Sequence, residues 1–434
     1  MKRRDFLLRT VPSVLLPSLI NGFSIRALAS SPFGQAARNM GSDHVLVLVQ
    51  LNGGNDGLNT VIPLEFYDAY HTARPNIAIP ENKILTLNGF DKTGLNPAMP
   101  ELQNLFNEGK LTIVQGVSYP QPNFSHFRAT DIWLSGADAG QILPTGWAGR
   151  YLNEQFPRFP DNYPNRDMPD PLAIQIGSLV SPALQGPALT MGMAISNPNS
   201  FYDMINERAA SAPATRAGDQ LAYIREMSVK TDQYAGVIKA AAQKVTKQSD
   251  KYPAAGKNPL ADQLKIVARL VAGGLKTRIY LVSMGGFDTH AKQTDENDTT
   301  TGNHARLLAK LSEAIGAFQD DLRFLQADGR VIGMTFSEFG RRIKSNASGG
   351  TDHGTAAPVL LFGNNLQPGI IGNNPSLPAN ATVNDNIPMQ YDFRALYASL
   401  LEKWFYADPA ITGSVLLKNY STLPLIGTSG ACGA

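Results

Sequence analysis

Three of the six histidines lie in short segments that are rich in glycine, aspartate, serine and threonine. Each segment follows or neighbours a stretch that is predicted to be a buried strand or the start of a helix. Aspartate and histidine side chains gathered at strand ends can form a metal site or an acid–base site in an α/β protein. The segments are Ser125-His126, Gly286-Phe287-Asp288-Thr289-His290 and Gly350-Thr351-Asp352-His353-Gly354.

The second segment places a carboxylate and an imidazole two residues apart, at Asp288 and His290. The two preceding glycines allow a sharp turn after a strand, so both side chains can project into a crevice. This pair suits one hard or borderline divalent ion. The alternative is that Asp288 caps a turn and His290 lies on the surface.

The third segment surrounds Asp352 and His353 with small residues, so that backbone can pack closely around both side chains. We expect His353 above all to have a functional role. The alternative is a glycine loop in which Asp352 only caps a turn.

The stretch 335–342 follows another predicted strand and contains one acidic and two basic side chains. Glu338 stands where a carboxylate ligand at a strand end would stand. Arg341 and Arg342 could clamp an anionic group. The alternative is that Glu338 and Arg341 pair with each other.

Ser125 is predicted at the start of a helix, where free N–H groups and the helix dipole stabilise negative charge. It is therefore a candidate nucleophile, with His126 beside it as a ligand or base and Arg128 facing an anionic substrate. The alternative is that Ser125 is only an N-cap.

The turn after the first predicted strand offers Asn52 or Asp56 as an oxygen ligand, and the alternative is a turn carboxylate. His44, His71 and His304 lack comparable surroundings, and we interpret them as surface or structural residues.

The elements that must position these residues alternate between strand and helix. Residues 45–51 form a nearly continuous apolar run, which predicts a strand buried on both faces and therefore a parallel sheet. The alternation predicts an α/β fold with a mainly parallel sheet. Further strands are expected at 111–114, 172–176, 278–283, 331–336 and 358–362, and helices at 97–106, 125–134, 303–326 and 391–405.

The predicted organisation is a single α/β domain over 44–425, with a helical insertion at about 201–276 that could form a cap or a side layer. Loops rich in proline and glycine at 153–171 and 364–388 could shape a substrate cleft. A linker at 30–43 precedes the domain, and a flexible tail at 426–434 follows it.

Composition excludes several classes of function. With 38 basic and 36 acidic residues, the chain has no field of one sign to hold nucleic acid or an anionic membrane. The only cysteine, Cys432, allows neither an intrachain disulfide nor a cysteine-based zinc site. The sequence contains no Gly-x-Ser-x-Gly elbow, P-loop or convincing dinucleotide fingerprint.

Residues 1–29 are predicted to be a targeting segment. Lys2-Arg3-Arg4-Asp5-Phe6-Leu7-Leu8 resembles the twin-arginine export motif, and Ala27-Leu28-Ala29 matches a small-x-small cleavage pattern. The apolar stretch between them is too short and too interrupted for a membrane-spanning helix. An ordinary secretory signal and an uncleaved anchor are the alternatives. The resemblance implies a bacterial protein that the twin-arginine machinery exports in folded form to the periplasm or beyond.

The motifs together resemble those of a twin-arginine-exported family known as domain of unknown function 1501. The resemblance runs from about Val45 to Trp404. It rests on the segments Leu51–Asn59, Ser125–Ala129, Gly146-Trp147, Gly286–His290, Ser337–Arg342 and Thr351–Gly354.

More distantly, the order of elements is similar to that of the alkaline phosphatase and sulfatase superfamily. This resemblance implies a three-layer α/β/α sandwich with divalent metal, one or two ions of zinc, manganese or calcium, at the carboxyl edge of the sheet. It implies Ser125 as nucleophile, with His126, Arg128 and Arg341 also at the catalytic centre. The implied metal ligands are Asp56, Asp288, His290, Glu338, Asp352 and His353.

This sequence departs from the superfamily pattern in ways that leave alternatives open. Phe339 stands where the pattern has a histidine ligand, and Asn52 is neutral if it rather than Asp56 is the first ligand. Alternatively, Asp352-His353 is itself the strand-end pair, and then the final histidine is missing.

The resemblance implies an exported metal-dependent hydrolase of phosphate or sulfate esters, with an anionic ester as its substrate. One alternative is a catalytically inactive cell-envelope binding or assembly protein on the same fold. Another is a metal-free esterase that uses Ser125 and His353.

Overall fold

The computed structural model describes residues 43–196 and 233–427. Its centre is a mixed sheet with the strand order β13-β5-β12-β9-β1-β8-β6-β7, and β14 pairs with β5 beside this path. The bounds are β1 (Val45–Leu51), β5 (Leu111–Ser118), β6 (Ala173–Ile176), β7 (Met193–Ile195), β8 (Ile279–Met284), β9 (Val331–Phe336), β12 (Ala357–Phe362), β13 (Gly369–Ile371) and β14 (Tyr391–Asp392).

Most neighbouring strands in this sheet are parallel. The strand β1 lies parallel to both β8 and β9, and β6 continues the parallel order beside β8. The exception is β12, which is antiparallel to both of its neighbours, β9 and β5. The prediction of an α/β fold with a mainly parallel sheet is therefore confirmed.

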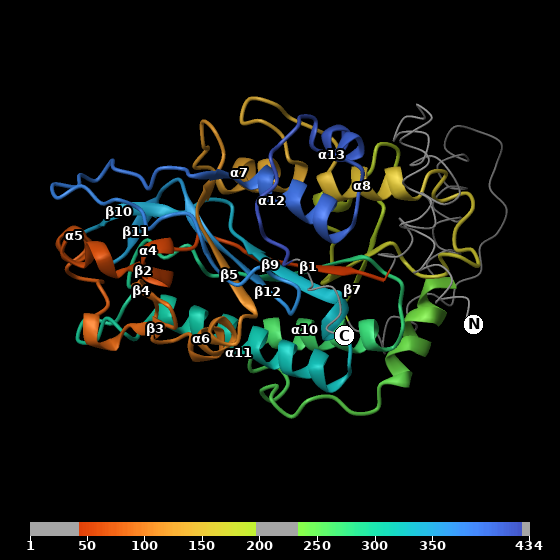
Figure 1. Cartoon of the computed structure of the whole chain (residues 1–434), viewed down its shortest axis with the longest axis horizontal. Helices are drawn as coiled ribbons and strands as arrows, with labels where there is room; N and C mark the ends of the chain where they lie inside the picture. Colours follow the sequence, from red (N-terminus) through yellow and green to blue (C-terminus); the bar gives the residue numbers. More distant parts are fainter. Residues whose placement is uncertain (1–42, 197–232, 428–434) are drawn as a thin grey trace, which may run out of the picture.

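Helices cover both faces of the sheet (Figure 1). One face is covered by α6 (Pro100–Asn107), α10 (Pro259–Ala272) and α11 (Asn303–Phe324). The other face is covered by α7 (His126–Ser135), α8 (Trp147–Gln155), α12 (Phe393–Ser399) and α13 (Pro409–Leu416). The result is the predicted three-layer sandwich.

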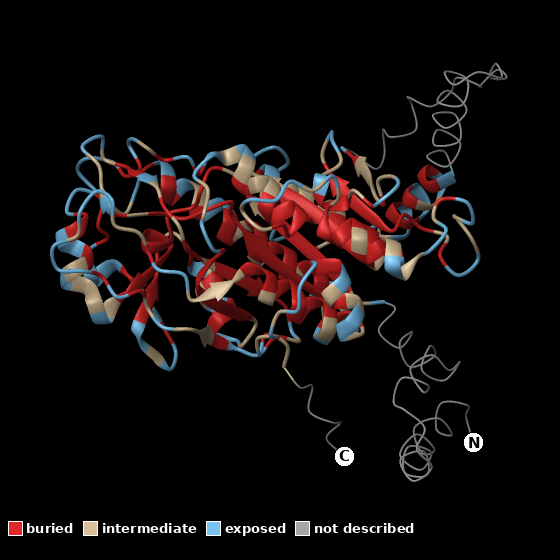
Figure 2. Ribbon diagram, turned by 90° about the horizontal axis from the view of Figure 1, so that it is seen from above, coloured by how far each residue is buried: buried red, intermediate tan, exposed pale blue. Residues whose placement is uncertain are grey.

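The sequence of β1 shows how the two cores arise. Val45, Val47 and Val49 face the α10–α11 layer, whereas Leu46 and Leu48 face the α8–α12 layer, because successive strand side chains point to opposite faces. Figure 2 shows buried residues concentrated in the sheet and in the helices that cover it.

A smaller unit lies at one end of the sandwich, on the left of Figure 1. It contains α4 (Gly57–Thr60), α5 (Tyr67–Ala73) and the antiparallel strands β2 (Val61–Pro63), β4 (Phe90–Leu95) and β3 (Leu85–Leu87). The pair β10 (Arg341–Ser345) and β11 (Thr351–His353) packs beside α4 and α5. The sequence patterns did not predict these short antiparallel strands.

Several predicted segments lie partly or wholly outside the described residues. They are the targeting segment 1–29, nearly all of the linker, most of the tail and residues 201–232 of the helical insertion. The rest of the insertion contains a helix over 233–244 and α10. Both contribute to the core on one face of the sheet. Within 43–196 and 233–427, no helix has the length and apolar character needed to cross a membrane.

Candidate metal centre

The carboxyl ends of β1, β8 and β9 bring three loops together. The turn after β1 packs directly on the loop after β8, because a Cβ on Gly53 would lie 2.3 Å from the backbone nitrogen of Asp288. Gly53 also has φ +125°, which a side chain would disfavour. Gly350 is equally close to the same loop, with a virtual Cβ 2.4 Å from the Thr289 carbonyl oxygen. Glycine at these positions allows the three loops to converge.

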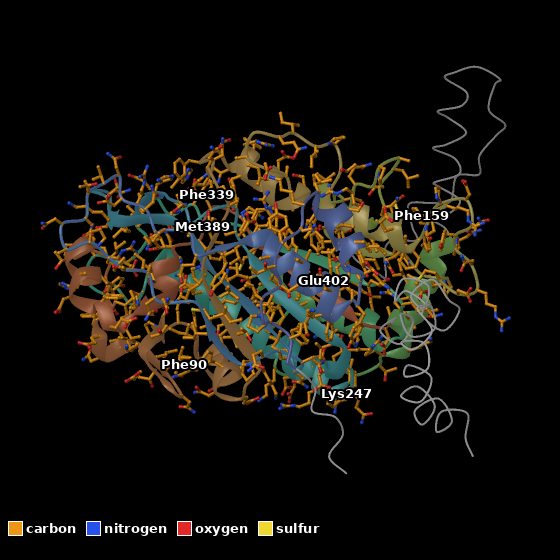
Figure 3. The ribbon with its side chains drawn as sticks, turned by 45° about the horizontal axis from the view of Figure 1, so that its top comes forward. Phe90, Phe159, Lys247, Phe339, Met389 and Glu402 are labelled. Atoms are coloured by element: carbon orange, nitrogen blue, oxygen red, sulfur yellow. The ribbon has the colours of Figure 1, made fainter. Side chains whose placement is uncertain are left out.

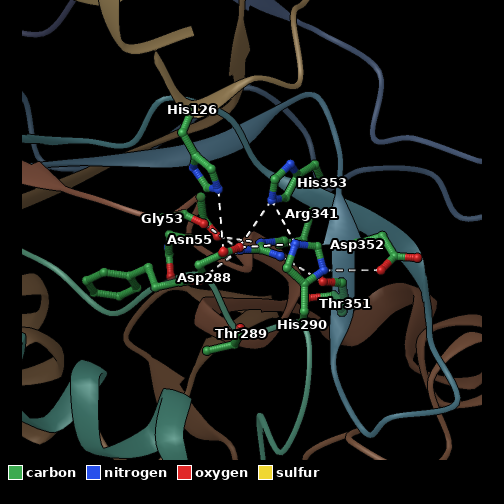
Figure 4. Close-up of polar contacts among 12 residues, drawn as sticks. Gly53, Asn55, His126, Asp288, Thr289, His290, Arg341, Thr351, Asp352 and His353 are labelled. Carbon is green, nitrogen blue, oxygen red and sulfur yellow. Dashed lines mark hydrogen bonds and ion pairs between the residues drawn. The ribbon is translucent and has the colours of Figure 1, made fainter. Parts of the chain in front are cut away.

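The Asp288 carboxylate lies at the centre of this convergence (Figure 4). Its Oδ1 is 3.2 Å from His290 Nε2 and 3.1 Å from His353 Nε2. Its Oδ2 is 3.4 Å from His126 Nε2. The Nε2 atoms of His290 and His353 are 2.9 Å apart. Three imidazole nitrogens thus surround one carboxylate.

Each imidazole has an acceptor at its other nitrogen. His126 Nδ1 is 2.8 Å from Glu338 Oε1, His353 Nδ1 is 2.9 Å from the Phe124 carbonyl oxygen, and His290 Nδ1 is 3.2 Å from Asp352 Oδ1. Because these oxygens accept and do not donate, the hydrogen of each neutral ring belongs on Nδ1. The Nε2 lone pairs then point at Asp288 and at one another.

This arrangement fits a cation. Neutral His290 and His353 would direct two lone pairs at each other across 2.9 Å, and only a proton or a metal ion between them relieves that contact. Burial, the largest influence, lowers the pKa of His353, and the neighbouring Asp288 carboxylate opposes this effect. A metal ion that accepts both lone pairs would fit this contact.

The spacing of the donor atoms also suits a metal ion. Ligands about 2.0–2.1 Å from a tetrahedral zinc ion lie ~3.3–3.4 Å from one another. The distances of 3.1–3.4 Å from Asp288 to the three histidines are close to this value. Ligand atoms of His126, Asp288 and His353 all lie within 4.8 Å of one another, and His290, beside Asp288 and His353, stands outside this group. Hydrogen bonds at the far nitrogen of each ring are typical of histidines that bind metal.

Asp288 carries its negative charge at neutral pH. Desolvation, the largest influence, raises its pKa, but the hydrogen bond and charge of Arg341, together with the neighbouring His353 and His290 rings, outweigh it and lower the pKa to about 2. The carboxylate is therefore an acceptor only, as a metal ligand must be.

Arg341 does not lie where it could clamp a substrate. Its side chain is fully buried, and its Nη2 donates to Asp288 Oδ1 at 2.7 Å. The guanidinium also donates to four backbone carbonyls of the converging loops, from Nη2 to Gly53 and Phe287, from Nε to Gly54 and from Nη1 to Thr351. The fully buried guanidinium has its contacts within the protein, so this geometry lends no support to the predicted anion-binding role. Arg341 instead holds the loops and Asp288 in place.

Glu338 and Asp352 lie behind the histidines and do not face the centre themselves. Glu338 is buried, and its Oε1 accepts from both His126 Nδ1 and the Gly53 N–H, each at 2.8 Å. Asp352 is exposed and accepts from His290 and from Asn346 Nδ2. The Asn346 hydrogen bond is the main reason why the pKa of Asp352 is lowered. Both carboxylates orient imidazole rings, and the alternative of a Glu338–Arg341 pair is replaced by an Asp288–Arg341 pair.

Asp56 is directed away from the centre. Its carboxylate forms a buried ion pair with Arg74 at 2.7 Å and accepts from Gln293 Nε2 at 2.6 Å. Burial raises its pKa, but the charge of Arg74 and these hydrogen bonds more than compensate, and the pKa is lowered. Arg74 comes from the end of α5, so this buried pair ties the smaller unit to the loop after β1.

Arg128 also has other partners. Its guanidinium contacts Asp131 on the same helix and donates to the carbonyls of Ala139 and Gln141, at 2.9 and 2.5 Å. It therefore fixes the loop after α7, and the prediction that it faces a substrate is not matched by these contacts.

Ser125 is the N-cap residue of α7, but its side chain makes no capping hydrogen bond to the helix. It is exposed, and the next residue is the centre's His126. The Ser125 hydroxyl therefore does not make the capping hydrogen bond that the N-cap alternative predicts.

A scan against family models matches residues 117–407 to a family described as protein of unknown function (DUF1501). The match spans well over half of the chain. This chain belongs to the DUF1501 family.

Solved structures that are similar to this chain at low identity and low TM-score include the following three. The C-terminal periplasmic domain of EcEptC from Escherichia coli, in complex with Zn, has a TM-score of 0.34 and 10% identity over 74% of this chain and 73% of that chain. The alkaline phosphatase from the Antarctic bacterium TAB5 has a TM-score of 0.30 and 13% identity over 74% and 91%. The PsFucS1 sulfatase from Pseudoalteromonas sp. has a TM-score of 0.34 and 11% identity over 79% and 69%.

The predicted DUF1501 membership is thus confirmed. At such identities and TM-scores the likeness says nothing about the activity of this DUF1501 chain. Comparison with curated proteins found no match.

Three residues around the centre were not predicted from the sequence. The Phe124 carbonyl fixes the ring of His353, and Asn346 holds Asp352. The ring of Phe339, labelled in Figure 3, packs 5.0 Å from the His126 ring and 4.4 Å from the His353 ring. The contact with the Phe124 backbone carbonyl could not be predicted from the sequence, because every residue has a carbonyl. The position of Phe339 directly after Glu338 was a sequence signal that its ring could lie near the centre.

His304, interpreted as a surface or structural residue, is buried and contacts Asn55 Oδ1 at 2.9 Å. Burial lowers its pKa to about 4, against the charge of Asp56, so the ring stays neutral at pH 7.

An open groove of about 750 Å³ adjoins the centre on the side of His126. Side chains at the carboxyl ends of β1, β8 and β6 form its floor, at Gln50, Ser283 and Gln175. One wall comes from α7 and the other from residues 179–182. Ligands of open α/β sheets commonly bind at this edge.

Proposed function

We propose that this DUF1501 chain is a metal-dependent hydrolase of phosphate or sulfate esters. The observation that carries the proposal is the set of three Nε2 atoms around the Asp288 carboxylate, each ring with its Nδ1 hydrogen-bonded from behind. The ester class rests on the order of motifs, which resembles that of alkaline phosphatases and sulfatases.

In this proposal His126, Asp288, His290 and His353 hold a divalent ion, with zinc as the best match to a set of three nitrogens and one oxygen. When bound, such an ion polarises the ester and stabilises negative charge on its oxygens. Glu338, Asp352 and the Phe124 carbonyl keep the three rings oriented. Arg341 keeps Asp288 ionised and in place.

The proposed nucleophile is the hydroxyl of Ser125. Its oxygen would attack the phosphorus or sulfur atom as the bond to the ester oxygen breaks, and the hydroxyl proton would pass to the departing alcohol. Water would then hydrolyse the serine ester, which would release phosphate or sulfate and restore the hydroxyl. Two features support this role: the hydroxyl makes no capping hydrogen bond, and the first turn of α7 presents free N–H groups that stabilise an anionic oxygen.

The export route belongs to the same proposal. Arg3-Arg4 in the segment 1–29 would direct the folded chain, already loaded with metal, through the twin-arginine machinery to the periplasm or beyond. Export in folded form suits a protein that acquires its ion before it crosses the membrane.

A second candidate function is a cell-envelope binding or assembly protein without catalysis. This alternative is favoured because the guanidinium groups of Arg128 and Arg341 both donate hydrogen bonds to acceptors within the protein. A phosphate or sulfate group would then depend on the metal ion for its neutralisation.

The deciding experiment measures metal content and ester hydrolysis on the purified protein that lacks residues 1–29. Inductively coupled plasma mass spectrometry should find about one equivalent of zinc, manganese or calcium in the wild type and a large loss in His353→Ala. Ser125→Ala should keep the metal and lose turnover of p-nitrophenyl phosphate or sulfate.

Absence of metal after incubation with these ions would overturn the proposal. Bound metal without turnover of either ester would favour the binding-protein alternative. Turnover that persists in the presence of a chelator would point instead to a metal-free esterase.

A further inference from the structure

We propose that the groove beside His126 binds the organic part of the ester, and that this part is uncharged and largely apolar, an alkyl or aryl group. The inference rests on the proposed function for the anionic head group, and it adds the class of substrate.

The groove is continuous with the metal centre. His126 belongs to both, and Glu338, which holds the His126 ring and the Gly53 N–H, lines the groove together with Gly53. An ester whose head group meets the Nε2 atom of His126 therefore has its organic part directed at, or next to, this groove. Its volume of about 750 Å³ lies in the range of pockets that hold groups of drug size.

The walls of the groove are apolar and exposed. The Phe127 side chain on α7 is 91% exposed, and Leu179 on the opposite wall is 80% exposed. Leu134, Val180 and Pro182 extend the apolar lining. Two large, exposed hydrophobic side chains that line one groove offer apolar area that an apolar ligand would cover.

The charge of the lining excludes a highly anionic organic part. Within the described residues, the lining of the groove includes no lysine or arginine. Of the two acidic residues in the lining, Asp131 is paired with Arg128, and Glu338 is held by His126. The floor carries neutral amides and a hydroxyl. A nucleotide or a polysulfated glycan would find no counter-charge here, whereas an alkyl or aryl group would cover Phe127 and Leu179.

The test uses alkylphosphonates, which carry the anionic head group but cannot be hydrolysed as esters. Methyl-, butyl- and octylphosphonate are titrated into the zinc-loaded protein by isothermal titration calorimetry. Each methylene that becomes buried should improve affinity about fourfold, so octylphosphonate should bind at least about 10-fold more tightly than methylphosphonate.

The double variant Phe127→Ser/Leu179→Ser should lose this dependence on chain length, and it should fold normally because both side chains are exposed. Ile142→Ser is the matched control, since Ile142 is 81% exposed but does not line the groove. Its affinities should equal those of the wild type. Equal affinity of the three phosphonates in the wild type, or a chain-length dependence that the double variant retains, would overturn the inference.

Neutral 1-octanol separates this inference from the proposed function. Binding of octanol to both the wild type and His353→Ala, with loss in the groove variant, would support the groove even if the metal centre proved wrong. Ester hydrolysis without any preference for longer alkyl groups would leave the proposed function standing and remove the groove.

Discussion

Glu338 and Asp352 give the sharpest internal comparison in the centre, because each holds the Nδ1 of one histidine from behind. Glu338 is 2.8 Å from His126 Nδ1 and its side chain is 3% exposed. Asp352 is 3.2 Å from His290 Nδ1 and its side chain is 55% exposed. Glu338→Gln and Asp352→Asn therefore remove the same charge with the same change of shape, one in a buried and one in a solvated environment.

The expected loss of zinc affinity differs between the two variants. A hydrogen bond to a charged partner contributes ~1–1.5 kcal/mol more than a neutral one, which corresponds to about 10-fold in affinity. Loss of a partner behind a metal-binding histidine typically costs ~10–100-fold. We expect a loss of about 10-fold or more for Glu338→Gln. Water screens the exposed Asp352, so Asp352→Asn should lose less than about 5-fold.

The assay is a competitive titration of zinc against a chelator of known affinity, with circular dichroism as the check on folding. Equal losses in the two variants, or an unchanged affinity in a folded Glu338→Gln protein, would refute the reasoning that the buried carboxylate orients a metal ligand.

Three further predictions concern the groups that build the centre. The pKa of Asp288 is lowered from 3.8 to about 2. The stability that its ionised form contributes is therefore complete above about pH 4 and is lost as the pH falls toward 2. Between pH 4 and 2, the metal-free Asp288→Asn variant should lose stability less steeply than the metal-free wild type, as measured by acid denaturation. Arg341→Met leaves buried carbonyls and a carboxylate without their donor and should destabilise the fold by about 3–5 kcal/mol, measured by urea denaturation, and a loss below about 1 kcal/mol would contradict the buried role. Gly53→Ala forces a Cβ to within 2.3 Å of the Asp288 nitrogen, so we expect a lower melting temperature together with weaker zinc binding. Gly89→Ala is the control, because Gly89 also has a positive φ but has open space around it. This control should lose stability and keep the zinc affinity of the wild type.

The parts of the fold that the sequence predicted well are those that local pattern determines. The apolar run of β1 and the long amphipathic α11 were predicted close to their observed bounds. The direction of β12 was not predicted, because apolar composition does not determine strand direction. A parallel return from β9 would need a crossover, usually a helix. The chain instead forms the β10–β11 hairpin and comes back antiparallel.

The candidate site shows the same division between local and distant information. Glycine-rich motifs indicated the loops that carry Asp288, His290 and His353, and the structure brings these residues together. Sequence could not tell which carboxylates face the centre and which lie behind a histidine, since that depends on side-chain direction. Nor could it show that Arg74 pairs with Asp56, because the pairing depends on how α5 packs.

The most direct test of the metal centre is a crystal structure of the zinc-loaded protein with anomalous data collected on both sides of the zinc edge. The proposed metal centre predicts an anomalous peak about 2.0–2.2 Å from Asp288 and from Nε2 of His126, His290 and His353. A peak at another place, or none among these four residues at full zinc loading, would contradict it.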